Sequence, residues 1–377
     1  MQRGFNFSEK IYHNSGFPIL KVLNIQKGEI NTDELIYFRK EDYSQNLDKF
    51  ILKPKEVCIT VSGASSGKIA INNHNQDFYL SSAVCALKVN NQITSDYLFH
   101  ALNKFEPKIK QLVRGGAIKG ISISELKNLL IPVPSIEIQN KISNFLNLHL
   151  ELISQLTCEL QLRKQQYEHY KEKLISQIQN TKTIEEIATQ IYRGNGVRKE
   201  FIGSGNYPYI VYGELYTKYG MCIYKPISSI NPDLISKKKY CEYGDLLITL
   251  TGENPKEIAT TSAYLGKDEC IAGWGLFVLK HNQNPKYLAY ALSTSNVQQQ
   301  KQMLASNSTM ANITADKLKQ IKIPLPPLEV QERIVNILDK FRKLCEYETG
   351  IAKEIEMAKK QYECYRDLLI IENWIKK

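Results

Sequence analysis

The sequence of 377 residues lacks several features that mark large classes of protein. It has no apolar run approaching about 18 residues, which excludes a membrane-spanning helix, and its first residues lack the apolar core of a signal peptide. Its eight cysteines are scattered without a CxxC pair, a pattern that fits reduced thiols in a cytoplasm and argues against a zinc site or a disulfide framework. With 43% hydrophobic and 23% charged residues, the chain is expected to fold as two or three domains.

Catalytic motifs are also missing. The Asn/Asp-Pro-Pro-aromatic loop of an adenine methyltransferase has its nearest match at 284–287, where lysine stands third, and we interpret this string as a helix cap. The phosphate-binding loop GxxxxGK(S/T) is approached at 63–69 but is one residue short and ends in Ile69. No convincing nuclease set PD…(D/E)xK and no histidine cluster is present. The sequence therefore predicts a binding protein rather than an enzyme.

Basic residues are in excess, and the excess is confined to two segments. The chain has 49 Lys and Arg against 39 Asp and Glu, a net charge of +10. Residues 1–130 and 181–322 each hold 17 basic and 12 acidic residues, whereas 131–180 and 323–377 are each neutral. This distribution indicates two basic modules that alternate with two neutral segments.

An internal repeat explains this alternation. The string IPVPSIEIQ at 131–139 recurs as IPLPPLEVQ at 323–331, an offset of 192 residues. Farther along, QYEHY at 166–170 matches QYECY at 361–365, and the offset has grown by three. The chain is therefore expected to consist of two similar halves with one difference in length.

Each half reads as an α/β part followed by a long helix. Short β-branched runs between Gly, Asn and Ser turns predict strands, and two helices are expected before the repeated motif. The strands are placed at 57–61, 85–89, 246–250 and 276–279, and the helices at 96–113 and 285–304. After each motif, apolar residues recur in steps of three and four over about 40 residues, which predicts a long helix with one apolar stripe.

An apolar stripe on a long helix needs a partner. We expect the two long helices to pair as an antiparallel coiled coil; the alternative is that each folds back on its own globular part. The residues expected to pack between the helices are Leu152, Leu156, Leu160 and Tyr167 in the first and Ile351, Ile355, Tyr362 and Tyr365 in the second.

The two basic modules are predicted to bind DNA, because two similar cationic modules suit two half-sites on a double helix. The loops after matching strands are the first candidates, since glycines and small hydroxyls let the backbone approach phosphate. Glu253 and Asn254 are suited to the amino group of cytosine and the edge of adenine. The alternative is that these segments are solvated turns, helix caps and exposed basic faces. The candidates are Ser62, Gly63, Ser65, Ser66, Gly67, Lys68, Arg114, Lys119, Arg198, Lys199, Lys237, Lys238, Lys239, Thr251, Gly252, Glu253, Asn254 and Lys256.

With both Ile-Pro-x-Pro-x-x-Glu-x-Gln motifs in view, the chain resembles the specificity subunits of Type I restriction–modification enzymes over nearly its whole length. The matching positions are Pro132, Pro134, Glu137, Gln139, Pro324, Pro326, Glu329 and Gln331. The resemblance implies an α/β (α+β) fold with a pseudo-twofold internal repeat. Its parts would be two target-recognition domains, at 1–130 and 181–322, and two long-helix conserved regions, at 131–180 and 323–377.

The function that the resemblance implies is that of a non-catalytic, cytoplasmic DNA reader. Each target-recognition domain would read one half of a bipartite, asymmetric site, and the helix pair would set the spacer between the halves. The helices would also dock two methyltransferase subunits, and through them the restriction and translocase subunits. S-adenosylmethionine, ATP and Mg are expected on those partners, and no cofactor or metal on this chain.

Two features depart from the family pattern. The segment 183–188, which opens the second half, has no counterpart in the first. The chain's own C-terminal end could supply it, the start could be misassigned, or the chain could be a silent or truncated cassette used for recombinational switching. The three-residue difference between the helices is expected to be absorbed as a local stammer. A coiled-coil scaffold protein remains the alternative outside the family.

Overall fold

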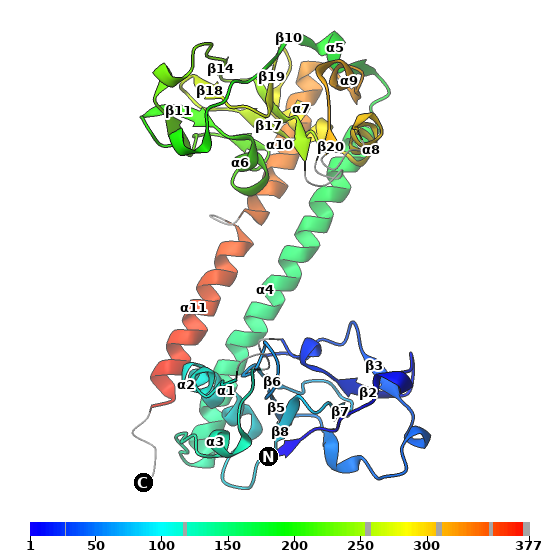
Figure 1. Ribbon diagram of the computed structural model, residues 1–377, viewed down its shortest axis with the longest axis vertical. Coiled ribbons are helices and arrows are strands. Elements are labelled where there is room, and N and C mark those ends of the chain that lie inside the picture. The colour runs from blue at the N-terminus through cyan, green and yellow to red at the C-terminus, as the bar shows by residue number, and fades with distance from the viewer. Residues whose placement is uncertain (27, 116–118, 253–257, 307–310, 347–349, 372–377) are drawn as a thin grey trace. The chain divides into compact units, whose positions relative to one another are not determined.

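The computed structural model describes residues 1–26, 28–115, 119–252, 258–306, 311–346 and 350–371 (Figure 1). The chain forms two compact units: unit 1 is Met1–Cys158 with Lys353–Lys377, and unit 2 is Glu159–Ala352. Each unit therefore combines an α/β part, here called module 1 or module 2, with parts of the long helices. The four-segment division made from the sequence stays a prediction.

Module 1 is built on two four-stranded sheets. The central sheet has the order β1-β8-β5-β6 with antiparallel neighbours, and the outer sheet has the order β3-β2-β7-β4, in which β2 and β7 are parallel. The strands are β1 (Gln2–Arg3), β2 (Phe17–Leu20), β3 (Ile36–Phe38), β4 (Ile51–Leu52), β5 (Val57–Thr60), β6 (Ile69–Ile71), β7 (Phe78–Leu80) and β8 (Val84–Leu87).

Both faces of the central sheet are buried, and alternate side chains of its strands pack on different neighbours. Val57 and Ile59 of β5 pack with helix α1 (Ser95–Lys104), whereas Cys58 between them packs with residues of the outer sheet. Successive side chains of a strand point to opposite faces, so a strand that is covered on both faces is apolar throughout.

The helices of unit 1 differ in one respect from the prediction. They are α1, α2 (Glu106–Gln111), α3 (Ile123–Lys127), the first part of α4 (Ile136–Ser176) and most of α11 (Ile351–Leu369). The single helix predicted over 96–113 is wrong, because Phe105 separates α1 from α2. The reason lies in Pro107, which stands in the first turn of α2, where its missing N–H costs no hydrogen bond.

Module 2 repeats the topology of module 1. Its central sheet, β10-β19-β15-β17-β12, adds one strand to the order of module 1, and its outer sheet is β13-β11-β18-β14. Two-stranded sheets pair β16 with β20 and β9 with β21. The strands are β9 (Thr181–Thr183), β10 (Ala188–Arg193), β11 (Tyr207–Ile210), β12 (Cys222–Ile223), β13 (Ser228–Ile230), β14 (Tyr240–Cys241), β15 (Leu246–Thr249), β16 (Thr251–Gly252), β17 (Thr261–Tyr264), β18 (Cys270–Ala272), β19 (Leu276–His281), β20 (Ala311–Asn312) and β21 (Lys322–Pro324).

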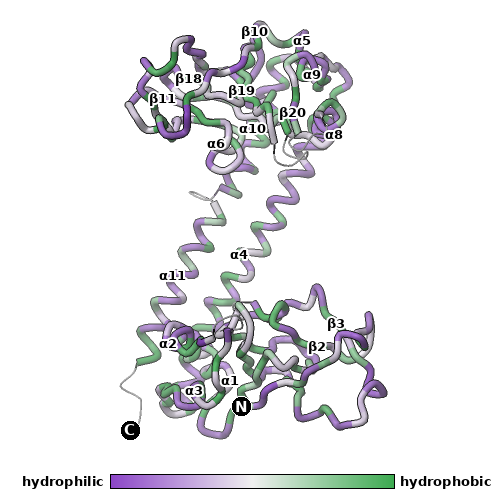
Figure 2. The backbone as a smooth tube through the Cα atoms, in the orientation of Figure 1, coloured by the Kyte–Doolittle hydropathy of each residue, from purple (hydrophilic) through white to green (hydrophobic). Residues whose placement is uncertain are grey.

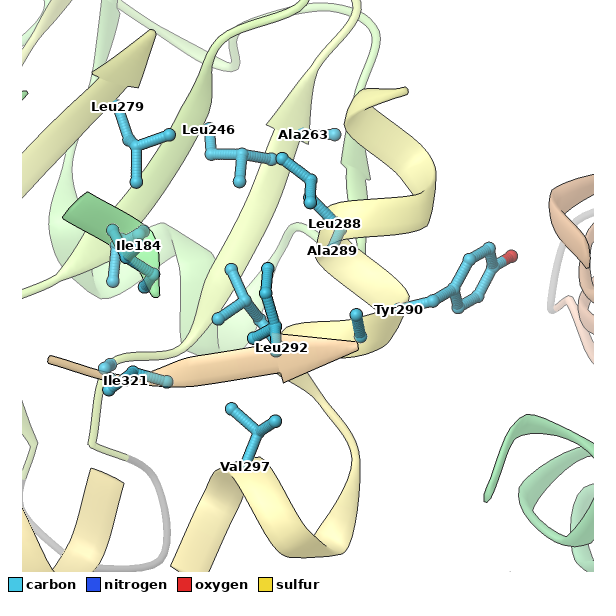
Figure 3. Close-up of a cluster of buried hydrophobic side chains, with 14 of the residues drawn as sticks. Ile184, Leu246, Ala263, Leu279, Leu288, Ala289, Tyr290, Leu292, Val297 and Ile321 are labelled. Atoms are coloured by element: carbon cyan, nitrogen blue, oxygen red, sulfur yellow. The ribbon is translucent and has the colours of Figure 1, made fainter. Parts of the chain in front are cut away.

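Helix α7 covers the central sheet of module 2. Figure 3 shows Leu288 and Leu292 of this helix in one buried cluster with Leu246, Ala263 and Leu279 of the sheet. The helix predicted over 285–304 is two helices, because residues 293 and 294 separate α7 from α8. The helices of unit 2 are α5 (Ile184–Ile187), α6 (Tyr212–Thr217), α7 (Pro285–Leu292), α8 (Ser295–Leu304), α9 (Ala315–Lys319) and α10 (Leu328–Cys345), with the last part of α4.

The glutamine that ends the repeated motif fastens each long helix to its module. Gln139 near the start of α4 is fully buried. Its Nε2 donates to the carbonyl oxygens of Gln92 and Pro134, each at 2.8 Å, and its Oε1 accepts from the N–H of Thr94 at 2.9 Å. We call this arrangement the glutamine clasp.

Unit 2 contains the same clasp. Gln331 is fully buried, donates from Nε2 to Pro326 O and Gln283 Oε1 at 2.8 Å each, and accepts from the N–H of Asn284 at 3.1 Å. The motif is therefore repeated because both halves of the chain need the same junction between the module and its long helix.

The long helices make contact within each unit. In unit 1, the ring of Tyr365 on α11 lies 5.2 Å from Phe145 and 5.1 Å from His149 of α4. His100 of α1 is fully buried between the helices, with Tyr362 Oη 3.0 Å from its Nδ1 and Asn147 Oδ1 2.8 Å from its Nε2. Module 1 therefore takes part of its core from α11, the last helix in the described part of the chain.

In unit 2, α4 and α10 run antiparallel where they contact each other. Tyr170 stacks on Phe341 at 5.1 Å. Burial raises the pKa of the Cys345 thiol, and the charges of Lys164 and Arg163 oppose that shift. Going backward along α4 thus corresponds to going forward along α10, as in an antiparallel pair. Pairing as a continuous coiled coil stays a prediction.

The predicted stripe of α4 needs one correction. Leu152 is 44% exposed, whereas Ile153 packs on the cluster that contains Tyr362, so the buried row passes through the next residue. Figure 2 shows hydrophilic and hydrophobic residues alternating along α4, as expected for a helix with a single apolar stripe. Of the other predicted packing residues of this helix, Leu156, Leu160 and Tyr167 are half-buried.

Tyr167 contacts module 2, the module of the other half of the chain, so it does not support the alternative in which α4 folds onto its own module. Its hydroxyl lies 3.3 Å from Met221 Sδ, and its ring lies 6.4 Å from that of Tyr290. Contact of α4 with its own module occurs near the start of the helix, where Ile142 and Leu146 lie in one buried cluster with Tyr97 of α1. On α11, Ile351, Ile355 and Tyr362 are buried, and Tyr365 is 38% exposed.

The second long helix is interrupted, which corrects the prediction of one continuous helix. Helix α10 ends at Cys345, with Glu346 extended after it, and α11 begins at Ile351. A Cβ at Gly350 would lie 2.4 Å from the carbonyl oxygen of Leu344, so only glycine fits there. The three additional residues of the second half fall between 331 and 362, the interval that contains this break, so a break rather than a stammer accompanies the length difference.

Candidate nucleic-acid interface

Three segments of module 1 meet at one edge of the central sheet, where β5 ends and β8 begins. Thr60 pairs with Val84 at this edge, and the N–H of Val61 donates to Ala83 O at 2.8 Å. The segment 119–121 joins them through hydrogen bonds from Gly63 N to Lys119 O at 2.8 Å and from Ile121 N to Val61 O at 2.9 Å. We call residues 61–68, 81–83, 114–115 and 119–121 the loop end of module 1.

The loop 61–68 is held by its own backbone. Thr60 is fully buried, and its Oγ1 donates to Ser65 O at 2.6 Å and accepts from Lys68 N at 2.9 Å. Ser66 Oγ donates to Gly63 O at 2.8 Å. Several of the predicted contact residues, including Ser66 and the buried Gly67, therefore shape the loop, while the Lys68 side chain is exposed.

The loop end of module 1 gathers the cationic residues that the sequence placed in two separate segments. Lys68, Arg114 and Lys119 are all exposed. Arg114 makes an ion pair with Glu125 at 3.1 Å, but an exposed pair of this kind is weak and leaves the guanidinium able to exchange partners.

Module 2 has an equivalent loop end. Thr249 pairs with Leu276, and the N–H of Leu250 donates to Gly275 O at 2.8 Å. Strand β16 pairs with β20, and Ile313 N donates to Leu250 O at 3.0 Å, so the segment before α9 takes the position that 119–121 has in module 1. The loop end of module 2 is defined by residues 250–252, 273–275, 306 and 311–313.

The predictions for the loop after β15 divide into two groups. Thr251 is only 8% exposed and Gly252 is buried. This burial does not fit their prediction as DNA-contact residues, and both instead position the loop. Glu253, Asn254 and Lys256 lie outside the described residues.

The basic segments of module 2 come together beside this loop end. Asn195 N donates to Ala272 O at 3.1 Å, and its side-chain amide donates to Lys237 O. The N–H of Ala272 donates to Lys239 O at 2.8 Å, which completes the junction. The segments 195–199 and 237–239, far apart in the sequence, therefore flank the corner at 273–275, and the predicted residues that they carry are Arg198, Lys199, Lys237, Lys238 and Lys239.

One residue at this corner was missed by the sequence analysis. Trp274 is 53% exposed, and the guanidinium of Arg193 lies 5.4 Å from the centre of its indole. The sequence does contain one signal for this corner. An Arg-Gly pair occurs in both halves, at 3–4 and at 193–194, and marks the strand that reaches the corner.

Two histidines with shifted pKa values, one buried and one half-buried, lie away from both loop ends. Burial lowers the pKa of His100 and of His281 to about 4 in each case. Within the described ranges, no group of three His, Cys, Asp or Glu residues is placed to hold a metal ion. No helix in the described part of the chain is both long and apolar enough to cross a bilayer.

The model of the Type I restriction modification DNA specificity domain matches residues 2–162 and 179–357. The chain belongs to this family. The two matched regions of the specificity protein correspond to its two halves, and its predicted fold class, two α/β modules with long helices, is confirmed.

Curated relatives of this specificity protein carry the same description. A putative Type I restriction enzyme specificity subunit of Haemophilus influenzae is 28% identical over 332 residues, which cover 81% of each chain. A Type I restriction enzyme specificity subunit of Escherichia coli is 28% identical over 325 residues, covering 78% of this chain and 76% of the relative. The relatives are thus specificity subunits rather than catalytic ones, which agrees with the prediction of a non-catalytic protein.

Solved structures show the same fold. The S subunit of a Type I restriction–modification system from M. genitalium matches with a TM-score of 0.57 and 17% identity, over 98% of this chain and 93% of that one. A chain from a study of complex assembly and conformational transition of the Type I system matches with a TM-score of 0.57 and 18% identity, over 96% and 92%.

Proposed function

We propose that this specificity protein reads a bipartite, asymmetric DNA site, with each module recognising one half. The observation that supports this most is the equivalence of the two loop ends. The same three segments meet there in both modules through matching backbone hydrogen bonds. The side chains that they present differ, so two similarly built surfaces offer different chemistry to DNA.

The charges at the loop ends suit the DNA backbone. Lys68, Arg114 and Lys119 in module 1, and the basic segments 195–199 and 237–239 in module 2, can contact phosphates and position the module. Such contacts release counterions, so DNA affinity is expected to fall steeply with salt. A coiled-coil scaffold would show no such slope.

The long helices are proposed to dock two methyltransferase subunits and to set the spacer between the half-sites. Large apolar side chains are exposed on these helices, which is unfavourable unless a partner covers them. They are Leu148, Leu152 and Leu162 on α4 and Met357 and Leu368 on α11. S-adenosylmethionine, ATP and Mg are proposed to belong to the methyltransferase and the restriction and translocase subunits, with none bound by this chain.

The test is a map of DNA methylation. The chain is co-expressed with the methyltransferase subunit of its own system in a host that lacks the modification, and N6-methyladenine is mapped across the host DNA. A single bipartite motif with a fixed gap is the expected result. Absence of both new methylation and co-purification would contradict the proposal. Separately, the purified chain should bind duplex DNA with an affinity that falls as salt rises.

A further inference from the structure

The corner that leads into β19 presents a half-exposed tryptophan. Trp274 is 53% exposed and precedes Gly275, whose φ of +87° is a conformation that suits glycine. The backbone on either side is anchored, because Gly273 N donates to Ile210 O at 2.9 Å and Leu250 N donates to Gly275 O at 2.8 Å.

The indole of Trp274 is held by its neighbours. Arg193 lies over the ring at 5.4 Å, and the ring of Tyr212 meets it edge-on at 6.1 Å. A Cβ at Gly196 would lie 2.3 Å from the Cβ of Trp274, and a Cβ at Gly275 would lie 2.9 Å from the ring of Tyr212. Two glycines therefore make room for this packing, and the exposed face of the indole has a defined position.

One cation lies on this ring, and two basic segments are joined to the same corner through the backbone. Arg193 is exposed beside it, and Asn195 and Ala272 tie the segments 195–199 and 237–239 to the same corner. Positive charge around an apolar plane matches a DNA groove, in which phosphates border the base edges. An apolar side chain in the major groove can contact the methyl group of thymine.

Module 1 has a different residue at the same position. Ser82 stands in the corner before β8, as Trp274 stands before β19, and the paired residues Thr60–Val84 and Thr249–Leu276 place both corners at the same edge. Arg3 Nε donates to Ser82 O at 2.6 Å, whereas Arg193 lies on the indole. The strand pairing at the two corners is alike, but module 1 carries the small hydroxyl of Ser82 where module 2 carries the large ring of Trp274.

We infer that Trp274 is a specificity-determining residue, which contacts a base edge in the half-site of module 2 through its exposed apolar face. This inference rests on the proposed function. It assigns the corner 273–275 to base reading and leaves the flanking lysines and arginines to the phosphates.

The experiment compares Trp274→Ser, which installs the residue of module 1, with the wild type in the methylation map. Tyr243→Ser is the matched control, because Tyr243 is an aromatic residue that is 71% exposed and precedes β15, at the opposite end of the strands that lead to the corner. Trp274→Phe retains an apolar ring and is expected to keep most of the discrimination.

The expected result is loss of base preference at one or two adjacent positions of one half-site, with discrimination there reduced by about tenfold or more. The other half-site and the gap should be unchanged, and Tyr243→Ser should give the wild-type motif. An unchanged motif, or a uniform decrease in methylation with the same motif, would overturn the inference. If Trp274→Ser gives no methylation, binding of that purified variant to duplexes altered at single positions of the half-site decides, and undiminished discrimination overturns the inference.

The failure of the inference and the failure of the proposed function are distinguishable. If the wild type itself produces no bipartite motif, the proposed function fails. If the wild type produces the motif and Trp274→Ser leaves every position intact, only the role of Trp274 fails.

Discussion

Lys301 on α8 provides a sharp test of how the core of module 2 is built. Its side chain is 2% exposed, and its Nζ donates to Ala259 O at 2.8 Å and to Leu292 O at 2.7 Å. Burial lowers the pKa of this ammonium to about 7. The corresponding residue of module 1, in the register that pairs Arg114 with Ser306, is the fully buried Ile109.

The pH dependence of stability follows from this shift. The ordinary pKa of lysine is 10.5, so between about pH 7 and that value the unfolded chain holds a proton that the folded chain has released. The free energy of unfolding therefore rises with pH in this window, by nearly 1.4 kcal/mol per unit for one group. From about pH 7.5 to 9.5 the contribution of Lys301 is about 2.5 kcal/mol.

The variant Lys301→Met removes this contribution. The stability of wild type minus that of the variant should rise by about 2.5 kcal/mol over the same interval, whatever the difference at the lower pH. Taking the difference cancels the tyrosines and thiols that titrate in both proteins. Lys267→Met, at an exposed lysine, is the control and should leave the pH dependence unchanged.

Buried cysteines allow each unit to be followed separately within the full chain. Cys241 and Cys270 are buried in unit 2, and Cys58 and Cys85 in unit 1. A brief pulse of alkylating reagent at graded urea concentrations, read by mass spectrometry, gives the fraction of each unit that is unfolded. A difference between wild type and Lys301→Met that stays constant across this pH range would refute the burial argument.

Three further outcomes test the interface, the clasp and the helix row. Lys68→Ser should weaken DNA binding and reduce the slope of log affinity against log salt by about one, whereas an unchanged slope would remove Lys68 from the phosphate contacts. Gln331→Met should destabilise unit 2 by about 2–4 kcal/mol, because several buried polar groups lose their partner; thiol labelling measures this, and a loss seen equally in unit 1 would contradict a local role. Ile355→Asn should lower the stability of unit 1 by about 2–3 kcal/mol through lost apolar burial, and Leu152→Asn, at an exposed position of the same helix pair, should change it by less than about 0.5 kcal/mol. Equal effects of the last two would refute the assignment of the buried row.

Local patterns in the sequence were enough to place much of the fold. The strands around Val57 and Leu246 are short apolar runs between turn residues, and the structure forms β5 and β15 within one residue of the predicted ends. The repeated motif located both long helices. Such features depend on neighbours in the chain, so periodicity and turn chemistry suffice to find them.

Features that depend on distant residues could not be predicted in this way. The stripe of α4 passes through Ile153 rather than Leu152, because the packing surface of module 1 and α11 decides which side of the helix is covered. The clasp of Gln139 requires a carbonyl and an N–H some 45 residues earlier in the chain. The recurring Arg-Gly pair marks the strand that reaches this corner, but only the folded chain shows that Arg193 lies on the ring of Trp274.

Because of the break between α10 and α11, the direction in which the side chains of one helix point does not fix the direction in which those of the other point. In an unbroken helix each inserted residue turns everything beyond it by about 100°, so an insertion in the middle of α4 would swing its later apolar side chains away from their partners. Helix α10 ends at Cys345 with Glu346 extended, so an insertion after Glu346 is not expected to rotate α10 against α11 in the same way. Length variation between related chains is therefore expected to accumulate at this point of the second helix and to be selected against along α4.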